Sequence, residues 1–263
     1  MRSIDLVDLP SAYANDQSAT SRLIVTRRGA HDGTYRAIGY LDRVRHDDGD
    51  AYEFSYLTPA VEQTGFVPII GFRDVHRHYS SPRLFPSFAE RVISAKRPDR
   101  PHYLEALDLG ADADAWEILS ASGGHREGDP IELISLPRYD RTTSATEAHF
   151  LAHGVRYCGE RASEHITKLV AGHRLSLRPE PTNPIDISAV QIVDGDHHLG
   201  YVPSPLLDYV HSVIDGGDYA LTVVRANPPG THAHLRLLLR LEGHCDEYVF
   251  DRSEWRAALP TAG

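Results

Sequence analysis

Hydrophobic and polar residues alternate along the first part of the chain as they do in β-strands. Apolar runs at residues 23–26 and 36–41 and the alternating segment 51–56 predict three strands, with a turn at 47–50. Strands joined by short turns pair antiparallel, so we expect a small antiparallel sheet. The residues before it, 1–20, are polar and predict a mobile leader.

Helical spacing replaces this pattern after residue 82. A helix can begin after Pro86, and two more are predicted over 101–109 and 112–120, the last ended by Gly123 and Gly124. A strand over 131–136 follows, and the polar segment 137–145 predicts a linker. We therefore expect a first α+β domain over residues 21–137.

The second half returns to β structure. Strands are predicted over 148–157, 174–178, 189–193, 199–202, 219–224 and 235–241, with helices over 162–170 and 205–214. A tight turn at 194–196 predicts a hairpin. Short strands with inserted helices predict a small, partly open β-barrel. We place this second domain at residues 146–245, within an α+β fold class.

Charge limits the partners that the chain can take. The formal net charge is −10 over 263 residues, and Lys96 and Lys168 are the only lysines. A protein that coats duplex DNA carries an excess of basic residues, so that class is excluded. A small pocket for a nucleic-acid end needs only a few placed groups and remains compatible with this composition.

Cysteine content and hydropathy indicate the compartment. The two cysteines, Cys158 and Cys245, cannot build a disulfide framework or a four-cysteine zinc site. No apolar run has the length of a signal peptide or a membrane span. We expect a soluble, cytoplasmic protein without a cofactor.

The segment Arg178–Val190 carries the most information. Its prolines at 179, 181 and 184 prevent a regular strand ladder. Asn183 before a proline favours a turn, and the side chain of Asp186 can cap that turn. The chain thus leaves one strand, makes a rigid excursion and re-enters the sheet at Ala189. Taken alone, the segment fits a structural connector as well as a binding loop.

Together with two further motifs, this segment resembles the HIRAN domain family. The motifs His153-Gly-Val-Arg-Tyr157, Arg178–Val190 and Leu199-Gly-Tyr-Val-Pro203 occur in the family's order over roughly residues 147–230. The resemblance implies an OB-like small barrel. From the characterised eukaryotic members it also implies binding of single-stranded DNA ends, especially at a free 3′-hydroxyl.

The same resemblance implies five site residues. Arg156 and Tyr157 would hold a phosphate and a base, and Asp186 would lie near the terminal sugar. Asn183 and Tyr201 would lie beside the same pocket.

Three positions depart from the family's pattern. Cys158 stands where a second aromatic residue is common, Ile185 replaces an aromatic residue, and Ser204 occupies a position that can be basic. Stacking contributes about 1–3 kcal/mol per base, so the lost aromatic rings predict a lower affinity for single strands.

The first half resembles another family. Segments 39–41, 52–56 and 84–91 are similar to the N-terminal subdomain of HipA-type kinases, which also occurs as small HipS-like antitoxins. Segments 79–86 and 118–125 resemble bacterial proteins that join such a region to a HIRAN domain. No kinase core follows. The resemblance implies a bacterial protein whose first half binds a protein partner, as an antitoxin-type regulator would.

A metal-dependent nuclease or hydrolase is the enzymatic alternative. It would use the histidines at 232, 234 and 244 with Cys245, but zinc needs three or four converging ligands. The carboxylates lack a distinctive spacing and are expected on a solvated face; they are Glu160, Glu164, Asp215 and Asp218. We therefore predict a non-enzymatic binding protein with no catalytic residue and no metal.

Overall fold

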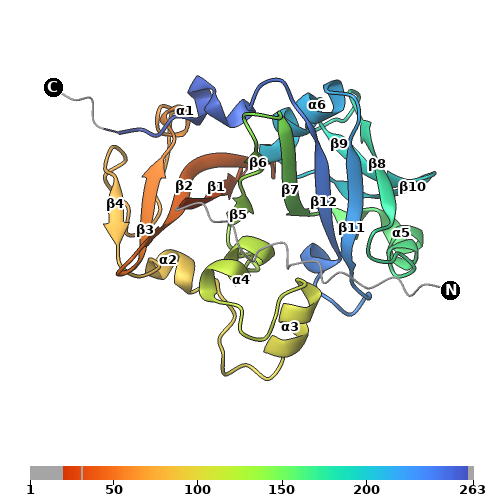
Figure 1. Ribbon diagram of the computed structural model, residues 1–263, viewed down its shortest axis with the longest axis horizontal. Helices are drawn as coiled ribbons and strands as arrows, with labels where there is room; N and C mark the ends of the chain where they lie inside the picture. Colours follow the sequence, from red (N-terminus) through yellow and green to blue (C-terminus); the bar gives the residue numbers. More distant parts are fainter. Residues whose placement is uncertain (1–19, 31, 260–263) are drawn as a thin grey trace.

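Two antiparallel β-sheets, one in each half of the chain, organise the computed structural model of the protein (Figure 1). The structure describes residues 20–30 and 32–259. The expected leader at 1–20 lies outside the described residues, apart from Thr20, which begins the first strand. Mixed strands and helices with two antiparallel sheets confirm the predicted α+β class at this level.

The first sheet has five strands in the spatial order β4-β3-β2-β1-β5. Their bounds are β1 Thr20–Arg28, β2 Tyr35–His46, β3 Gly49–Tyr56, β4 Tyr79–Ser81 and β5 Ile131–Ser135. The strands predicted at 23–26, 36–41, 51–56 and 131–136 are β1, β2, β3 and β5. β5 pairs with β1, which brings the end of this half back to its beginning.

Aromatic rings build the core beside this sheet. Phe54, Phe72 and Phe88 have ring centroids 4.4 to 5.7 Å apart. Phe88 comes from α2, Pro86–Ala89. The helix expected after Pro86 is therefore a single turn, while α1, Thr58–Val61, is another short turn that the sequence did not indicate.

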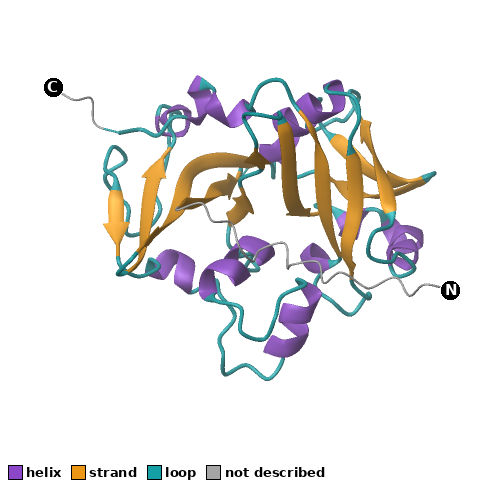
Figure 2. Ribbon diagram, in the orientation of Figure 1, coloured by secondary structure: helices purple, strands orange, loops and turns teal. Residues whose placement is uncertain are grey.

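Two longer helices follow α2 in the chain and lie below the strands in the view of Figure 2. They are α3, Arg100–Ala106, and α4, Ala115–Ser122. Asp114 and Glu117 form a capping box at the start of α4, since each side chain bonds the other residue's backbone N–H. Gly123 ends α4 in the left-handed conformation, with φ 66°. The helices predicted over 101–109 and 112–120 are confirmed, with shifted ends.

The second sheet has seven strands in the order β10-β9-β8-β11-β12-β7-β6. Their bounds are β6 Arg138–Tyr139, β7 Ala145–Leu151, β8 Arg174–Pro179, β9 Val190–Asp194, β10 His197–Tyr201, β11 Ala220–Ala226 and β12 Leu237–His244. Every neighbouring pair is antiparallel. The expected linker at 137–145 was wrong in part, because it contains the edge strand β6.

This sheet does not close into the expected barrel with a continuous ladder. β10 and β6 are its two edges, and a single bridge between His153 and Tyr201 links the chain after β7 to β10. Gly154 has φ 69°, so the chain leaves the extended conformation directly after the bridge between His153 and Tyr201. The strand predicted over 148–157 therefore ends at Leu151, and Arg156 and Tyr157 lie on a 3₁₀ turn instead.

Helices fill the connections of the second half. They are η1 Val155–Tyr157, α5 Gly159–Ile166, η2 Ser204–Leu206, α6 Leu207–Asp215 and η3 Ala233–Leu235. α6 buries one face against the sheet, and its Tyr209 hydroxyl lies 3.0 Å from the Thr146 hydroxyl of β7. Within the residues the structure describes, no helix has both the length and the apolar character needed to cross a membrane.

The C-terminal segment leaves the second sheet and packs against the first (Figure 1). It contains η4 Val249–Asp251 and η5 Ser253–Trp255, and Trp255 stacks on Tyr40 of β2 with centroids 6.3 Å apart. Ala257 bridges to Leu57. One hydrophobic core consequently includes residues of both halves. The boundaries 21–137 and 146–245 stay a prediction.

Candidate functional site

Arg156 and Tyr157 form an exposed cation–aromatic pair on η1. The Arg156 guanidinium lies 4.6 Å from the centroid of the Tyr157 ring and donates to the Tyr157 hydroxyl at 2.6 Å. The Tyr157 side chain is 73% exposed. The Tyr157 ring does not pack in the core, so it is available to stack on a ligand.

The loop between β8 and β9 is shaped by its own polar side chains. The Asn183 amide oxygen accepts from the backbone N–H groups of Ile185 and Asp186, at 3.0 and 3.1 Å. The Asp186 carboxylate accepts from the N–H of Ser188 at 2.9 Å, as the sequence predicted. Asn183 therefore holds the loop that presents Asp186.

Glu180 connects this loop to β10, a role that sequence analysis missed. Its carboxylate accepts from the Asn183 amide at 2.7 Å and from the Tyr201 hydroxyl at 3.0 Å. The hydrogen bond from Asn183, followed by that from Tyr201, lowers the pKa of this half-buried carboxyl. Glu180, Asn183 and Tyr201 thus form one chain of hydrogen bonds across two of the motifs. Glu180 could have been found because it lies inside the proline-rich motif.

Cys158 and His198 pack on the same side of β10. The Cys158 sulfur is 3.7 Å from the Gly154 carbonyl oxygen and 3.9 Å from the His198 ring nitrogens. Burial raises the pKa of the thiol to about 11, so it stays protonated near neutral pH. His198 meets the Tyr201 ring edge-on at 4.6 Å. Cys158 is thus a small packing group where an aromatic residue was expected.

A cleft of about 440 Å³ lies beside the loop. Asp186 lines it, but the other four predicted site residues do not. One wall belongs to the part of the chain that resembles the HIRAN family and is called the HIRAN wall; it consists of Ile185, Asp186 and Ser188 with residues at the start of η2 and α6. The second wall consists of residues 34–37 at the start of β2 together with Trp255. Nothing in the sequence pattern indicated the second wall, because both of its segments lie far from the loop in the sequence.

Electrostatic interactions connect the second wall to the predicted residues. Burial raises the pKa of the Tyr35 hydroxyl, and the Arg156 charge is among those that oppose the rise. The hydrogen bond to Asp32 raises the pKa of Arg36, and the Asp186 charge adds to it. Arg156 and Asp186 therefore each act on a residue at the start of β2, although they lie far apart in the sequence.

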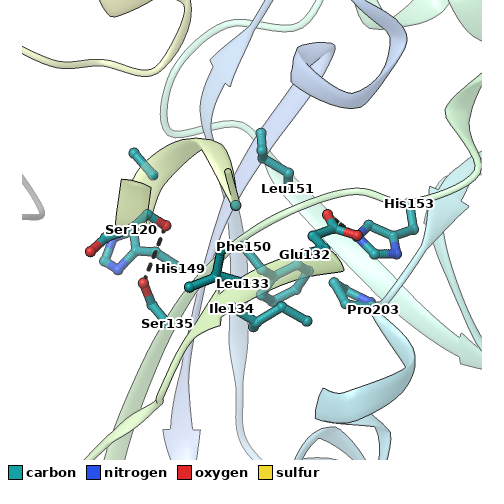
Figure 3. A pocket seen from close by; sticks show the side chains of 12 residues that line it. Ser120, Glu132, Leu133, Ile134, Ser135, His149, Phe150, Leu151, His153 and Pro203 are labelled. Atoms are coloured by element: carbon teal, nitrogen blue, oxygen red, sulfur yellow. Dashed lines mark hydrogen bonds and ion pairs between the residues drawn. The ribbon is translucent and has the colours of Figure 1, made fainter. Parts of the chain in front are cut away.

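The two sheets meet at a buried ion pair (Figure 3). Glu132 of β5 and His153, which follows β7, approach at 3.1 Å between Oε1 and Nε2. Burial opposes the charge on each group, but their mutual attraction lowers the pKa of Glu132 and raises that of His153. The adjoining cavity of about 20 Å³ has room for a single water molecule. Because His153 also bridges to Tyr201, this pair holds the predicted site against the first sheet.

The residues of the metal alternative do not converge. His232 and His234 lie at the start of η3 rather than on a strand, with ring centroids 5.7 Å apart. Within residues 20–30 and 32–259, no group of three or more His, Cys, Asp or Glu side chains is arranged to hold a metal ion. The four carboxylates of the acid–base alternative are all exposed; they are Glu160, Glu164, Asp215 and Asp218.

A family model agrees with the motifs of the second half. Residues 147–245 match the model of the HIRAN domain family. The crystal structure of the HIRAN domain of human HLTF is similar at 15% sequence identity and a TM-score of 0.28, over 40% of this chain and 78% of that chain. No curated protein matches the chain. The HipS-like interpretation of the first half stays a hypothesis. The chain therefore contains a HIRAN domain at residues 147–245.

Proposed function

We propose that this chain binds the ends of single-stranded DNA through its HIRAN domain, without catalysing a reaction. The observation that carries the proposal is the exposed pair of Arg156 and Tyr157 within residues matched to the family. Guanidinium groups bind phosphate through paired donors, and aromatic rings stack on bases of any sequence.

Asp186 supports recognition of an end rather than of a continuous strand. An ionised carboxylate only accepts hydrogen bonds, so it favours a free sugar hydroxyl and disfavours a phosphate. The net charge of −10 also favours local contacts over coating of a long strand. Ile185 is 68% exposed and offers an apolar contact without stacking, which points to modest affinity.

Fluorescence anisotropy with short single strands tests this proposal. Arg156→Ala should weaken binding about tenfold, the equivalent of one charge-assisted hydrogen bond at roughly 1.5 kcal/mol. Strands with a 3′-hydroxyl should bind more tightly than strands with a 3′-phosphate. Arg97→Ala is the control, since Arg97 is exposed, paired with Asp99 and outside the HIRAN match. Absent binding, or equal binding by the Arg156→Ala variant, would refute the proposal.

A protein-binding role of the first half is the second candidate. Val67 and Ile70 are 65% and 90% exposed. Their carbonyl groups are nevertheless held, because Arg27 donates to Val67 and Ser87 donates to Ile70. Two apolar side chains on a fixed backbone favour a protein contact. Cross-linking in host lysate should identify one partner that the Ile70→Ser variant fails to capture; equal capture by that variant would oppose the idea.

A further inference from the structure

The cleft beside Asp186 has a wall that lies outside the HIRAN match. Tyr35 and Arg36 come from the start of β2, and Trp255 comes from the C-terminal segment. The volume of about 440 Å³ is within the range of about 300–1,000 Å³ that is usual for small-molecule sites. A binding site made by the HIRAN domain alone would therefore be incomplete on this side.

The charges of the cleft suit one end of a nucleotide chain. Among the described residues that line the cleft, Arg36 alone is cationic, while Asp186 and Asp208 carry carboxylates. Arg36 pairs with Asp32, and the two side chains are 50% and 39% exposed. Exposed ion pairs contribute little to stability, so a phosphate can replace Asp32 as the partner at small cost. The carboxylates meanwhile favour a hydroxyl group over a second phosphate.

Trp255 adds a hydrogen-bond donor without a partner. Its indole Nε1 is buried and has no acceptor among the described residues. Buried donors without acceptors are rare and call for an explanation. The ring packs on Tyr40 and Phe250, which keeps the indole in place at the edge of the cleft. The N–H is shielded from solvent, so an acceptor on a base is a suitable partner for it only when the ligand turns the indole toward the cleft.

We propose that the start of β2 and Trp255 complete the nucleotide site of the HIRAN domain. The terminal nucleotide occupies the cleft, with its phosphate on Arg36 and its sugar hydroxyl on Asp186. This inference rests on the proposed binding of single-stranded ends. It adds a contact from the first half of the chain, so that neither half forms the whole site.

The test compares Arg36→Ala with Arg97→Ala in the full chain. Each change removes one arginine from an exposed pair with an aspartate, so the net charge changes equally. Anisotropy with a 3′-hydroxyl single strand is measured over a series of salt concentrations. We expect Arg36→Ala to weaken binding roughly tenfold, and the slope of log K against log salt to fall by about 0.7, the value for one phosphate contact on a single strand. Arg97→Ala should change neither quantity.

The outcomes separate the inference from the proposed function. If Arg36→Ala behaves as Arg97→Ala does while Arg156→Ala still weakens binding, the second wall is not part of the site and the inference is overturned. If the wild-type chain does not bind, or Arg156→Ala has no effect, the proposed function fails first and the inference fails with it. Trp255→Phe keeps the ring and removes the donor, so a loss of affinity with an unchanged salt slope is expected and an unchanged affinity would remove Trp255 from the site.

Discussion

The two walls of the cleft use their polar groups differently. On the HIRAN wall, Asp186 accepts from a backbone N–H of its own loop, and Asn183 of the same loop, which does not line the cleft, accepts from two more. On the second wall, Arg36 has only the exposed Asp32 as its ion-pair partner, and the Trp255 N–H has no acceptor among the described residues. One wall is preorganised by internal hydrogen bonds, while the other keeps donors that a ligand can use.

The position of the two walls depends on the junction of the sheets. Glu132 belongs to the first sheet, and His153 links to Tyr201 of the second. Changing Glu132 disturbs this junction directly, and changing Gly154 disturbs the turn next to it. Lowering the pH acts on buried histidines near the junction.

Glu132→Ala should have the largest effect. It leaves His153 in a buried place without its partner, and breaking a buried pair in this way costs about 3 kcal/mol of the free energy of unfolding. Chemical denaturation measures the loss. Glu127→Ala, at an exposed position of the same half, should stay within about 0.5 kcal/mol of the wild type. Equal stability of the two variants would show that the pair does not hold the sheets together.

Gly154→Ala should have the next largest effect. Gly154 has φ 69°, and an added Cβ would lie 3.3 Å from the Tyr201 ring. The left-handed conformation costs about 1–2 kcal/mol in a residue with a side chain, and the contact adds to it. Gly159→Ala is the matched control, with φ 83° and open space around the new Cβ. Thermal unfolding should show a larger loss for Gly154→Ala, and a loss of DNA affinity in that variant alone; equal losses would mean that the Tyr201 contact does not matter.

Mild acid should have the smallest effect. Burial lowers the pKa of His149 to about 4 and that of His234 to about 3, so both stay neutral in the folded chain. The unfolded chain takes up these protons near pH 6.5, so stability should fall by about 1 kcal/mol per histidine as the pH drops from 6.5 to 5.5. His153 acts in the opposite direction: its raised pKa stabilises the folded state below pH 6.5, and this contribution is lost as the pH rises through that pKa.

The pH series is checked by thermal unfolding of the wild type, His234→Gln and His46→Gln. His234→Gln should flatten the fall in stability between pH 6.5 and 5. His46 is exposed, so its replacement should leave the slope as it is. If stability falls with pH equally steeply in His234→Gln and in the wild type, the buried His234 is not responsible for the acid sensitivity.

Local patterns predicted most elements of both halves. Apolar runs and period-two alternation located β1 to β3 and β8 to β12, because both patterns can be recognised without knowing the partner strand. Gly123 correctly ended α4. The strand expected over 148–157 was confirmed as far as Leu151 and wrong beyond it, where Gly154 adopts a left-handed conformation that the apolar pattern around it does not show. The linker expected at 137–145 contains β6 because pairing with β7 outweighs its polar composition.

Local sequence motifs also identified part of the candidate site. Arg156, Tyr157, Asn183, Asp186 and Tyr201 could be named because they lie in contiguous motifs, and the order of those motifs identified the HIRAN domain. Their local hydrogen bonds, such as the cap formed by Asp186, also follow from short sequence separations.

The sequence by itself determined the strands, the proline-shaped loop and the family of the second half, because each depends on neighbouring residues. Only the tertiary structure decided that Tyr35, Arg36 and Trp255 lie beside that loop. It also decided that Glu132 meets His153, and that the second sheet stays open with one bridge at its edge. These contacts join segments far apart in the chain, and burial of a shared core, rather than any local pattern, brings them together.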